Sequence, residues 1–185
     1  MTDAWAARTG LTAILITVPE LAAYTRRWRS VSRSSARPQV PLDELIPPHV
    51  TVLVPWVAEP TADDADRLRA VARTVQPFEL SFPTAGQFPN GTVWLRPEPF
   101  DTVQALLRAV FAAFPQCPPY GGEFPDAHPH LTISSSAQGG PAVLAEAQAA
   151  LAAEPPPAVQ LTELGLWRED ENGVWSQFGA VPLGD

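Results

Sequence analysis

Two short motifs contain two of the three histidines of this chain. His49 is followed two residues later by Thr51, and His130 is followed two residues later by Thr132. An imidazole titrates near neutral pH, so it can accept or donate a proton under working conditions. A threonine hydroxyl can donate a hydrogen bond to a phosphate oxygen, whose charge must be stabilised in a transition state. Residues of these types suit the cleavage of a phosphodiester without a metal ion.

Strand geometry would place each histidine beside its threonine. Side chains alternate between the two faces of a strand, so His49 and Thr51 share one face of a strand predicted over 48–54, and valines occupy the other face. His130 and Thr132 share one face of a second strand in the same way. One imidazole would then take a proton from the attacking water or hydroxyl, and the other would give a proton to the leaving oxygen.

The distance between the two motifs indicates a repeat. His130 lies 81 residues after His49 (130 − 49), and candidate strands and helices elsewhere share this offset. The corresponding segments are 12–18 with 93–99, 20–21 with 101–102, 61 with 142 and 78–80 with 159–161. Each half is therefore predicted to contain a strand, a helix, a His-x-Thr strand, a helix and a strand.

Helix and turn signals support this division. From Asp101, the predicted N-cap, apolar residues recur at the spacing of one helix face. The segment after Thr61 has acidic residues first and arginines later, which suits the helix dipole, and Pro141 is a good first helical residue. Segments 161–167 and 174–181 predict a C-terminal hairpin.

These elements predict a single α+β domain over residues 1–185. We expect a bilobal pseudo-twofold repeat, with approximate lobes at 11–90 and 91–181 and the exchange of elements between lobes left open. Two antiparallel sheets would form a central cleft, with helices on their outer faces. Each lobe would place one His-x-Thr motif beside the cleft.

The composition limits the partners and the location. The net charge is −8, whereas a binder of duplex DNA normally needs a basic face. We expect a small nucleotide or an RNA end as the substrate and no duplex DNA partner. The apolar run at 11–18 is too short to span a bilayer and lacks a cleavage site after it, so no membrane partner is expected. A single cysteine excludes an internal disulfide, which is consistent with a cytoplasmic location.

One basic segment stands out in this acidic chain. It contains Arg26, Arg27, Arg29, Arg33 and Arg37. These arginines could steer a nucleotide phosphate towards the site, or they could form a solvated helix end and loop.

Three further residues are candidates for substrate binding. Tyr120 lies in a Pro- and Gly-rich loop before the second motif, where binding groups are common. Trp94 alternates with Val93 and Leu95 and could stack on a base, and Ser134 continues the face of the second motif. Ordinary packing is an equal alternative for Tyr120 and a somewhat stronger one for Trp94.

A metal site is a weaker alternative. His128 and His130, with Asp126 nearby, could form a metal pair, but only His49 remains as a further histidine to complete the site. We therefore expect no metal and no cofactor.

The chain resembles the 2H phosphoesterases, the group that includes bacterial 2′-5′ RNA ligase-like proteins and 2′,3′-cyclic phosphodiesterases. The resemblance rests on Pro-Pro-His-Val-Thr at 47–51 and Pro-His-Leu-Thr at 129–132. The segment 88–97 supports it, and it extends over about 11–181.

This resemblance implies a bilobal fold with a central cleft, and the hydrolysis of cyclic phosphates or reversible 2′-5′ bond chemistry without a cofactor. By position, it implies that His49 and His130 are the acid and the base, in either order, and that Thr51 and Thr132 hold the phosphate. Our main expectation is a 2′,3′-cyclic phosphodiesterase. The alternatives are a 2′-5′ RNA ligase or phosphodiesterase, a binding module without turnover, and a metal-dependent hydrolase.

Overall fold

The structure is a computed structural model that describes residues 10–33, 38–124, 126 and 128–184. It confirms the α+β class, with eight strands in one antiparallel sheet of order β6-β3-β4-β5-β2-β1-β7-β8. The strands are β1 (Thr12–Thr17), β2 (His49–Leu53), β3 (Phe78–Gln87), β4 (Val93–Glu98), β5 (Leu131–Ser134), β6 (Val159–Leu161), β7 (Glu163–Glu169) and β8 (Trp175–Pro182). The α-helices are α1 (Ala22–Arg29), α2 (Leu42–Leu45), α3 (Ala62–Ala72), α4 (Phe100–Ala113) and α5 (Pro141–Ala153).

Strands β2 and β5, at whose starts the two histidines lie, are side by side at the middle of the sheet. Val50 of β2 pairs with Leu131 of β5 in antiparallel register. On either side of this pair, β1 is the other neighbour of β2 and β4 is the other neighbour of β5. The strand order therefore brings together two motifs that are far apart in the sequence.

The prediction of two sheets is not confirmed, because one ladder of strands runs through both halves of the chain. Strand β3 pairs with β4, and β1 pairs with β7, which lies late in the chain. A continuous ladder satisfies backbone N–H and C=O groups that two separate sheets would leave open at their facing edges. The boundary expected at residues 90–91 lies in the turn between β3 and β4.

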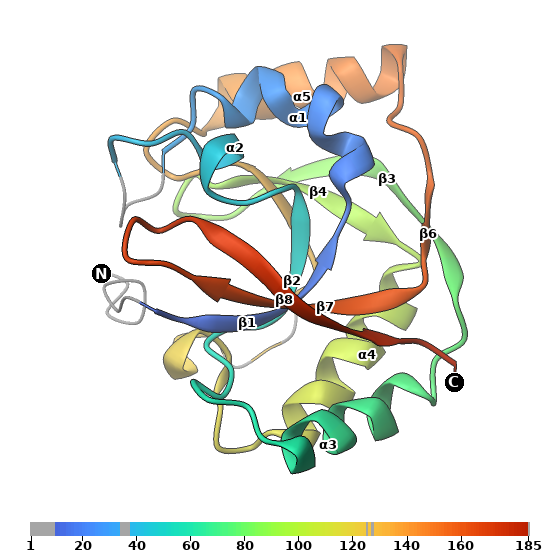
Figure 1. Ribbon diagram of the computed structural model, residues 1–185. Coiled ribbons are helices and arrows are strands. Elements are labelled where there is room, and N and C mark those ends of the chain that lie inside the picture. The colour runs from blue at the N-terminus through green and yellow to red at the C-terminus, as the bar shows by residue number, and fades with distance from the viewer. Residues whose placement is uncertain (1–9, 34–37, 125, 127, 185) are drawn as a thin grey trace.

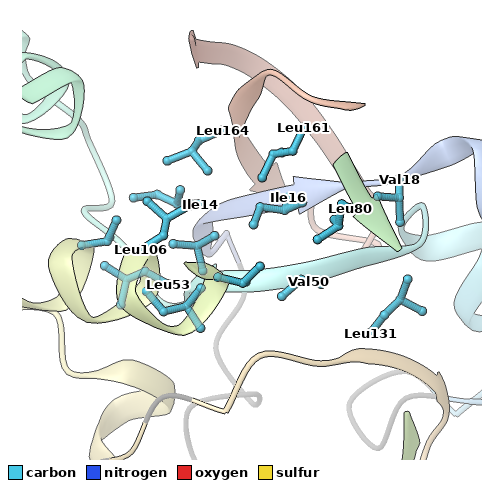
Figure 2. Packing of buried hydrophobic residues seen from close by; sticks show 14 of the residues in the cluster. Ile14, Ile16, Val18, Val50, Leu53, Leu80, Leu106, Leu131, Leu161 and Leu164 are labelled. Atoms are coloured by element: carbon cyan, nitrogen blue, oxygen red, sulfur yellow. The ribbon is translucent and has the colours of Figure 1, made fainter. Parts of the chain in front are cut away.

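A single large apolar cluster joins the sheet to its helices. Ile14, Val50 and Leu53 from the strands and Leu106 from α4 are essentially unexposed members of it. Figure 2 shows Ile14, Leu53 and Leu106 close together beside the helix, with Val50 farther along its strand. In Figure 1, α1 and α5 lie together at one end of the view and α3 and α4 at the other, with the strands between them.

The predicted helices and hairpin are present, with one corrected cap. Helix α3 begins with a capping box between Thr61 and Asp64, and α5 begins at Pro141. The N-cap position of α4 is Pro99, which makes no side-chain capping hydrogen bond, and Asp101 lies in the first turn of the helix. The Glu98 carboxylate accepts a hydrogen bond from the Phe100 N–H at 2.8 Å, so it satisfies a donor that an N-cap side chain would otherwise take.

Candidate active site

The two histidines occupy matching positions at the starts of adjacent strands. His49 is the first residue of β2, and His130 immediately precedes β5. The next residues, Val50 and Leu131, are fully buried in the core. Because side chains alternate, the imidazoles and the threonines two residues later are directed to the opposite face.

The pairing of β2 with β5 predicts close neighbours across the strands. Val50 and Leu131 are partners, so one further step of antiparallel register sets His49 opposite Thr132 and Thr51 opposite His130. Each imidazole is then flanked by a threonine on its own strand and by one across the sheet. Thr51 and Thr132 are both partly exposed, as are the two histidines.

Both imidazoles are oriented by the same local hydrogen bond. His49 Nδ1 lies 2.8 Å from the Pro47 carbonyl oxygen, and His130 Nδ1 lies 2.7 Å from that of His128. A carbonyl can only accept, so Nδ1 is the protonated nitrogen that donates in each ring. The neutral ring then has its lone pair on Nε2. Two Nε2 atoms are therefore available for proton transfer at the face that both motifs share.

The surroundings of the rings keep them neutral. Burial, the positive charge of Arg29 and the charge of His130 lower the pKa of His49 to about 4, against the hydrogen bond to Pro47. Burial also lowers the pKa of His130 to about 4, aided by the charge of His128. Because each imidazolium disfavours charge near it, the first proton taken up by the pair opposes the second.

Tyr120 lies beside the first motif. Its phenol hydrogen-bonds with the Thr51 side chain, and burial, the larger effect, raises the phenol pKa. The Tyr120 N–H donates to the Val54 carbonyl at 2.6 Å, which holds the turn Pro119–Gly122 against the end of β2. Tyr120 adopts φ of 51°, uncommon for a residue other than glycine. The loop candidate from the sequence is thus placed at the site.

An apolar wall extends from Tyr120 across this part of the sheet. Tyr120 and Trp175 pack with Ile46 against the buried Leu15 and Trp167. This second cluster is separate from the main core. It gives the His49 side of the site an aromatic surface, which the sequence did not predict.

Trp94 lies on the His130 side. It projects opposite to the buried Val93 and Leu95, and its ring lies 5.0 Å from the His128 ring and 5.4 Å from Phe88, measured between centroids. The Phe88 ring meets His130 edge to face at 4.9 Å. Trp94 is therefore linked to His130 through Phe88.

Phe88 is a site residue for which sequence reasoning assigned no role. It follows β3 directly, and its backbone N–H donates to Thr92 across the β3–β4 turn. The available signal was its place in the segment that supports the family resemblance.

Ser134 and the arginines of the basic segment differ in their exposure. Ser134 is 2% exposed, so the structure does not bring its side chain to the open face with Thr132. Arg29 is 1% exposed, whereas Arg26 is exposed, and Arg37 lies outside the described residues. The basic segment is therefore not one continuous surface.

A cavity of about 270 Å³ adjoins the first motif. Its lining includes Arg29, Ile46, Pro47 and Trp175. Within the described part of the chain, no group of three or more His, Cys, Asp or Glu side chains is arranged to hold a metal ion. No helix over the same residues is long and apolar enough to cross a membrane.

Solved structures of other proteins have a fold similar to that of this chain. Escherichia coli LigT, in crystal structures complexed with NADP+ and with 3′-AMP, superposes with TM-scores of 0.60 and 0.59 at 20% and 19% identity. Both comparisons cover 96% of this chain, and 99% and 100% of LigT, respectively. The protein TT0787 of Thermus thermophilus matches with a TM-score of 0.55 at 16% identity, over 94% of this chain and 98% of that one. Comparison with curated protein sequences gives no match.

The structure thus combines an antiparallel α+β fold with two His-x-Thr segments on adjacent strands. The family model of the 2′-5′ RNA ligase superfamily matches residues 17–173. The chain therefore belongs to this superfamily of 2H phosphoesterases, as the sequence resemblance implied. It is accordingly an enzyme of phosphodiesterase or ligase type.

Proposed function

We propose that this enzyme hydrolyses a cyclic phosphodiester, above all the 2′,3′-cyclic phosphate of a nucleotide or RNA end, without a metal ion. One observation supports this most directly. Two imidazoles, each with Nδ1 bound to a carbonyl, share a face with two threonines on adjacent strands. A cyclic phosphate needs one proton removed from water and one supplied to the leaving oxygen, and this pair matches that need.

The proposed reaction is a single displacement at phosphorus. A neutral imidazole accepts the water proton through Nε2 while the water oxygen bonds to phosphorus. One ring P–O bond breaks, and the second imidazole, as the cation, gives its Nε2 proton to the departing ribose oxygen. The product is a phosphomonoester, and proton exchange with solvent restores the pair. The atoms balance without a cofactor.

The lowered pKa values affect how the acid form arises. Near neutral pH both imidazoles are neutral in the free protein, because each pKa is about 4. A bound phosphodiester has a negative charge, and an opposite charge nearby raises the pKa of an imidazole. Substrate binding would therefore promote protonation of one ring. The mutual repulsion of the two rings favours one proton on the pair over two.

The threonines and Tyr120 would hold the non-bridging oxygens. Thr51 and Thr132 are partly exposed beside the imidazoles, so their hydroxyls can donate to phosphate. Tyr120 supports Thr51 through the hydrogen bond between their side chains. Trp94 would provide a ring against which a base can stack.

Small nucleotides fit this proposal. The related LigT has been crystallised with 3′-AMP, NADP+ and ATP. We infer that the present enzyme also accepts a small nucleotide, in line with its net charge of −8, which disfavours long polyanions.

Reversible 2′-5′ bond chemistry is the second candidate. The superfamily name favours it. Partly exposed aromatic residues lie on both sides of the histidines, Tyr120 and Trp175 on one side and Phe88 and Trp94 on the other, and these could accept two bases. The same acid and base would serve, with a ribose hydroxyl replacing water.

The test compares 2′,3′-cyclic nucleotides with 2′-5′ linked dinucleotides, in EDTA and with added divalent metals. We expect ring opening in EDTA, and a fall of about 10²–10⁴-fold in kcat in each of His49→Ala and His130→Ala, because each removes a proton-transfer group. Thr51→Ala and Thr132→Ala should lower kcat less. Thr102→Ala, at an exposed position on α4, is the matched control.

Three outcomes would contradict the proposal. Full activity in both histidine variants would rule out the His/His mechanism. Tight nucleotide binding with no product from any substrate would indicate a binding module. Activity that disappears in EDTA and returns with a metal would favour the metal-dependent alternative.

A further inference from the structure

Arg29 is a buried cation close to the active site. It is the last residue of α1, is 1% exposed and is among the largest fully buried side chains. Burying an ionised group is costly unless hydrogen bonds compensate it, and burial lowers the pKa of this guanidinium to about 10. At neutral pH the group is nonetheless charged.

The guanidinium donates hydrogen bonds to backbone carbonyls from two parts of the site. Nη1 donates to the Thr132 carbonyl at 2.9 Å, and Nη2 donates to the Ile46 carbonyl at 2.5 Å and the Leu42 carbonyl at 3.2 Å. Thr132 belongs to the second motif. Ile46 directly precedes Pro47, whose carbonyl accepts the hydrogen bond from His49. A single side chain thus ties the second motif to the segment that orients the first histidine.

A planar guanidinium suits this task. Its donors are fixed in a fork, so contacts to two segments set the distance and angle between them. An ammonium group is a compact point donor on a flexible stem and cannot reproduce that fork. The ladder between β2 and β5 is short, with Val50 paired to Leu131, so backbone pairing alone constrains the two segments weakly.

We propose that Arg29 is a positioning residue that fixes the two His-x-Thr segments relative to each other. This role rests on the proposed phosphodiesterase function. The positive charge of Arg29 also disfavours protonation of His49. Misplacing reacting groups by about 1 Å can cost about 10²-fold in rate, so loss of the fork should be visible in kcat.

Few groups affect the protonation of His49, so their effects can be measured separately. Arg29 from α1 and His130 from the adjacent segment both disfavour its protonation by their charge. The Tyr120 phenol reaches the same motif through Thr51. Asp43 acts on Arg29, where its charge opposes the effect of burial. Removing Arg29 should therefore affect His49 more than His130.

The experiment uses Arg29→Met and Arg29→Lys, with Arg108→Met as the matched control at an exposed position on α4. Imidazole pKa values are measured by NMR, with signals assigned from His49→Ala and His130→Ala. We expect Arg29→Met to raise the pKa of His49 more than that of His130 and to lower kcat about tenfold or more. Arg29→Lys should leave the pKa of His49 near the wild-type value and still lower kcat. Arg108→Met should change neither.

The outcomes separate this proposal from the function on which it rests. If the wild type cleaves no phosphodiester, the NMR titration still tests the charge effect. Folding of each variant is checked by circular dichroism. A second hydrogen bond, in which Ser32 Oγ accepts from the Ser135 N–H at 2.7 Å, also connects the end of α1 to β5 and does not depend on Arg29. If Arg29→Met does not fold, Arg29→Lys decides, and wild-type kcat there would overturn the positioning role. An unchanged His49 pKa in folded Arg29→Met would overturn the charge effect.

Discussion

At the scale of single residues, the imidazoles of His49 and His130 should couple stability to pH. Their pKa values are about 4 in the folded protein and 6.5 in an unperturbed side chain. Below pH 6.5 the unfolded chain therefore binds more protons than the folded one, and the free energy of unfolding should fall as pH is lowered towards 4. The slope of the free energy of unfolding against pH reports how many more protons the unfolded chain binds. We expect His49→Asn and His130→Asn each to lower that number by up to about one proton. Urea denaturation at several pH values between about 5 and 7.5 measures it.

The chosen pH range excludes two carboxyls whose pKa values are also displaced. Hydrogen bonds lower the pKa of Asp64 and of Glu98 below their ordinary values of 3.8 and 4.5. Their contributions to stability are lost only as pH falls below this range. Asp64→Asn should keep the wild-type slope. If both histidine variants also keep it, the imidazoles are not held neutral by the fold.

Sequence patterns predicted the residues whose positions follow from strand geometry. They did not predict the residues that tertiary packing brings to the candidate site. Alternation along one strand is enough to put His49 beside Thr51, and the loop position was enough to suggest Tyr120. Phe88 and Arg29 reach the site through contacts with segments distant in sequence, which no local pattern contains. Ser134 shares the expected alternation with Thr132, but the packing around it buries its side chain.

At the scale of strands, β3 and β4 position Trp94 through a glycine. Gly86 and Trp94 are partners in the ladder, and a Cβ added at Gly86 would overlap ring atoms of Trp94. Gly86→Ala should displace that ring and, with it, Phe88. We expect a loss of about 1–3 kcal/mol in the free energy of unfolding, as for other overpacked sites. The KM for a nucleotide should also rise.

Urea denaturation followed by tryptophan fluorescence, together with steady-state kinetics, measures both effects. Gly179→Ala is the matched control on β8, where the nearest atom to an added Cβ is Leu166 Cδ1 at 3.3 Å, the end of a flexible side chain. Equal losses in the free energy of unfolding of the two variants would show that overlap with the Trp94 ring is not the cause of the loss in Gly86→Ala. Normal KM in a destabilised Gly86→Ala would place Trp94 outside the substrate site.

At the scale of the whole molecule, strand pairing was the part of the fold that the sequence left open. The common offset predicted which elements each half contains, because periodicity and caps are local. Pairing of β1 with β7 joins residues near the two ends of the chain, and it depends on which apolar faces can share one core. Nothing in the spacing of Thr12–Thr17 and Glu163–Glu169 identifies that partnership.

The net charge of the chain should affect its preference for short or long substrates. A chain of net charge −8 repels a long polyanion more than a mononucleotide, and salt screens that repulsion. We therefore expect kcat/KM for a long RNA with a 2′,3′-cyclic phosphate end to rise with ionic strength relative to kcat/KM for a cyclic mononucleotide. Kinetics between about 20 and 200 mM salt measure this ratio, since the Debye length falls from above about 10 Å to below it over that range. A ratio that falls steeply with salt would mean that exposed arginines such as Arg26 and Arg27 form an RNA-binding surface that overcomes the net charge.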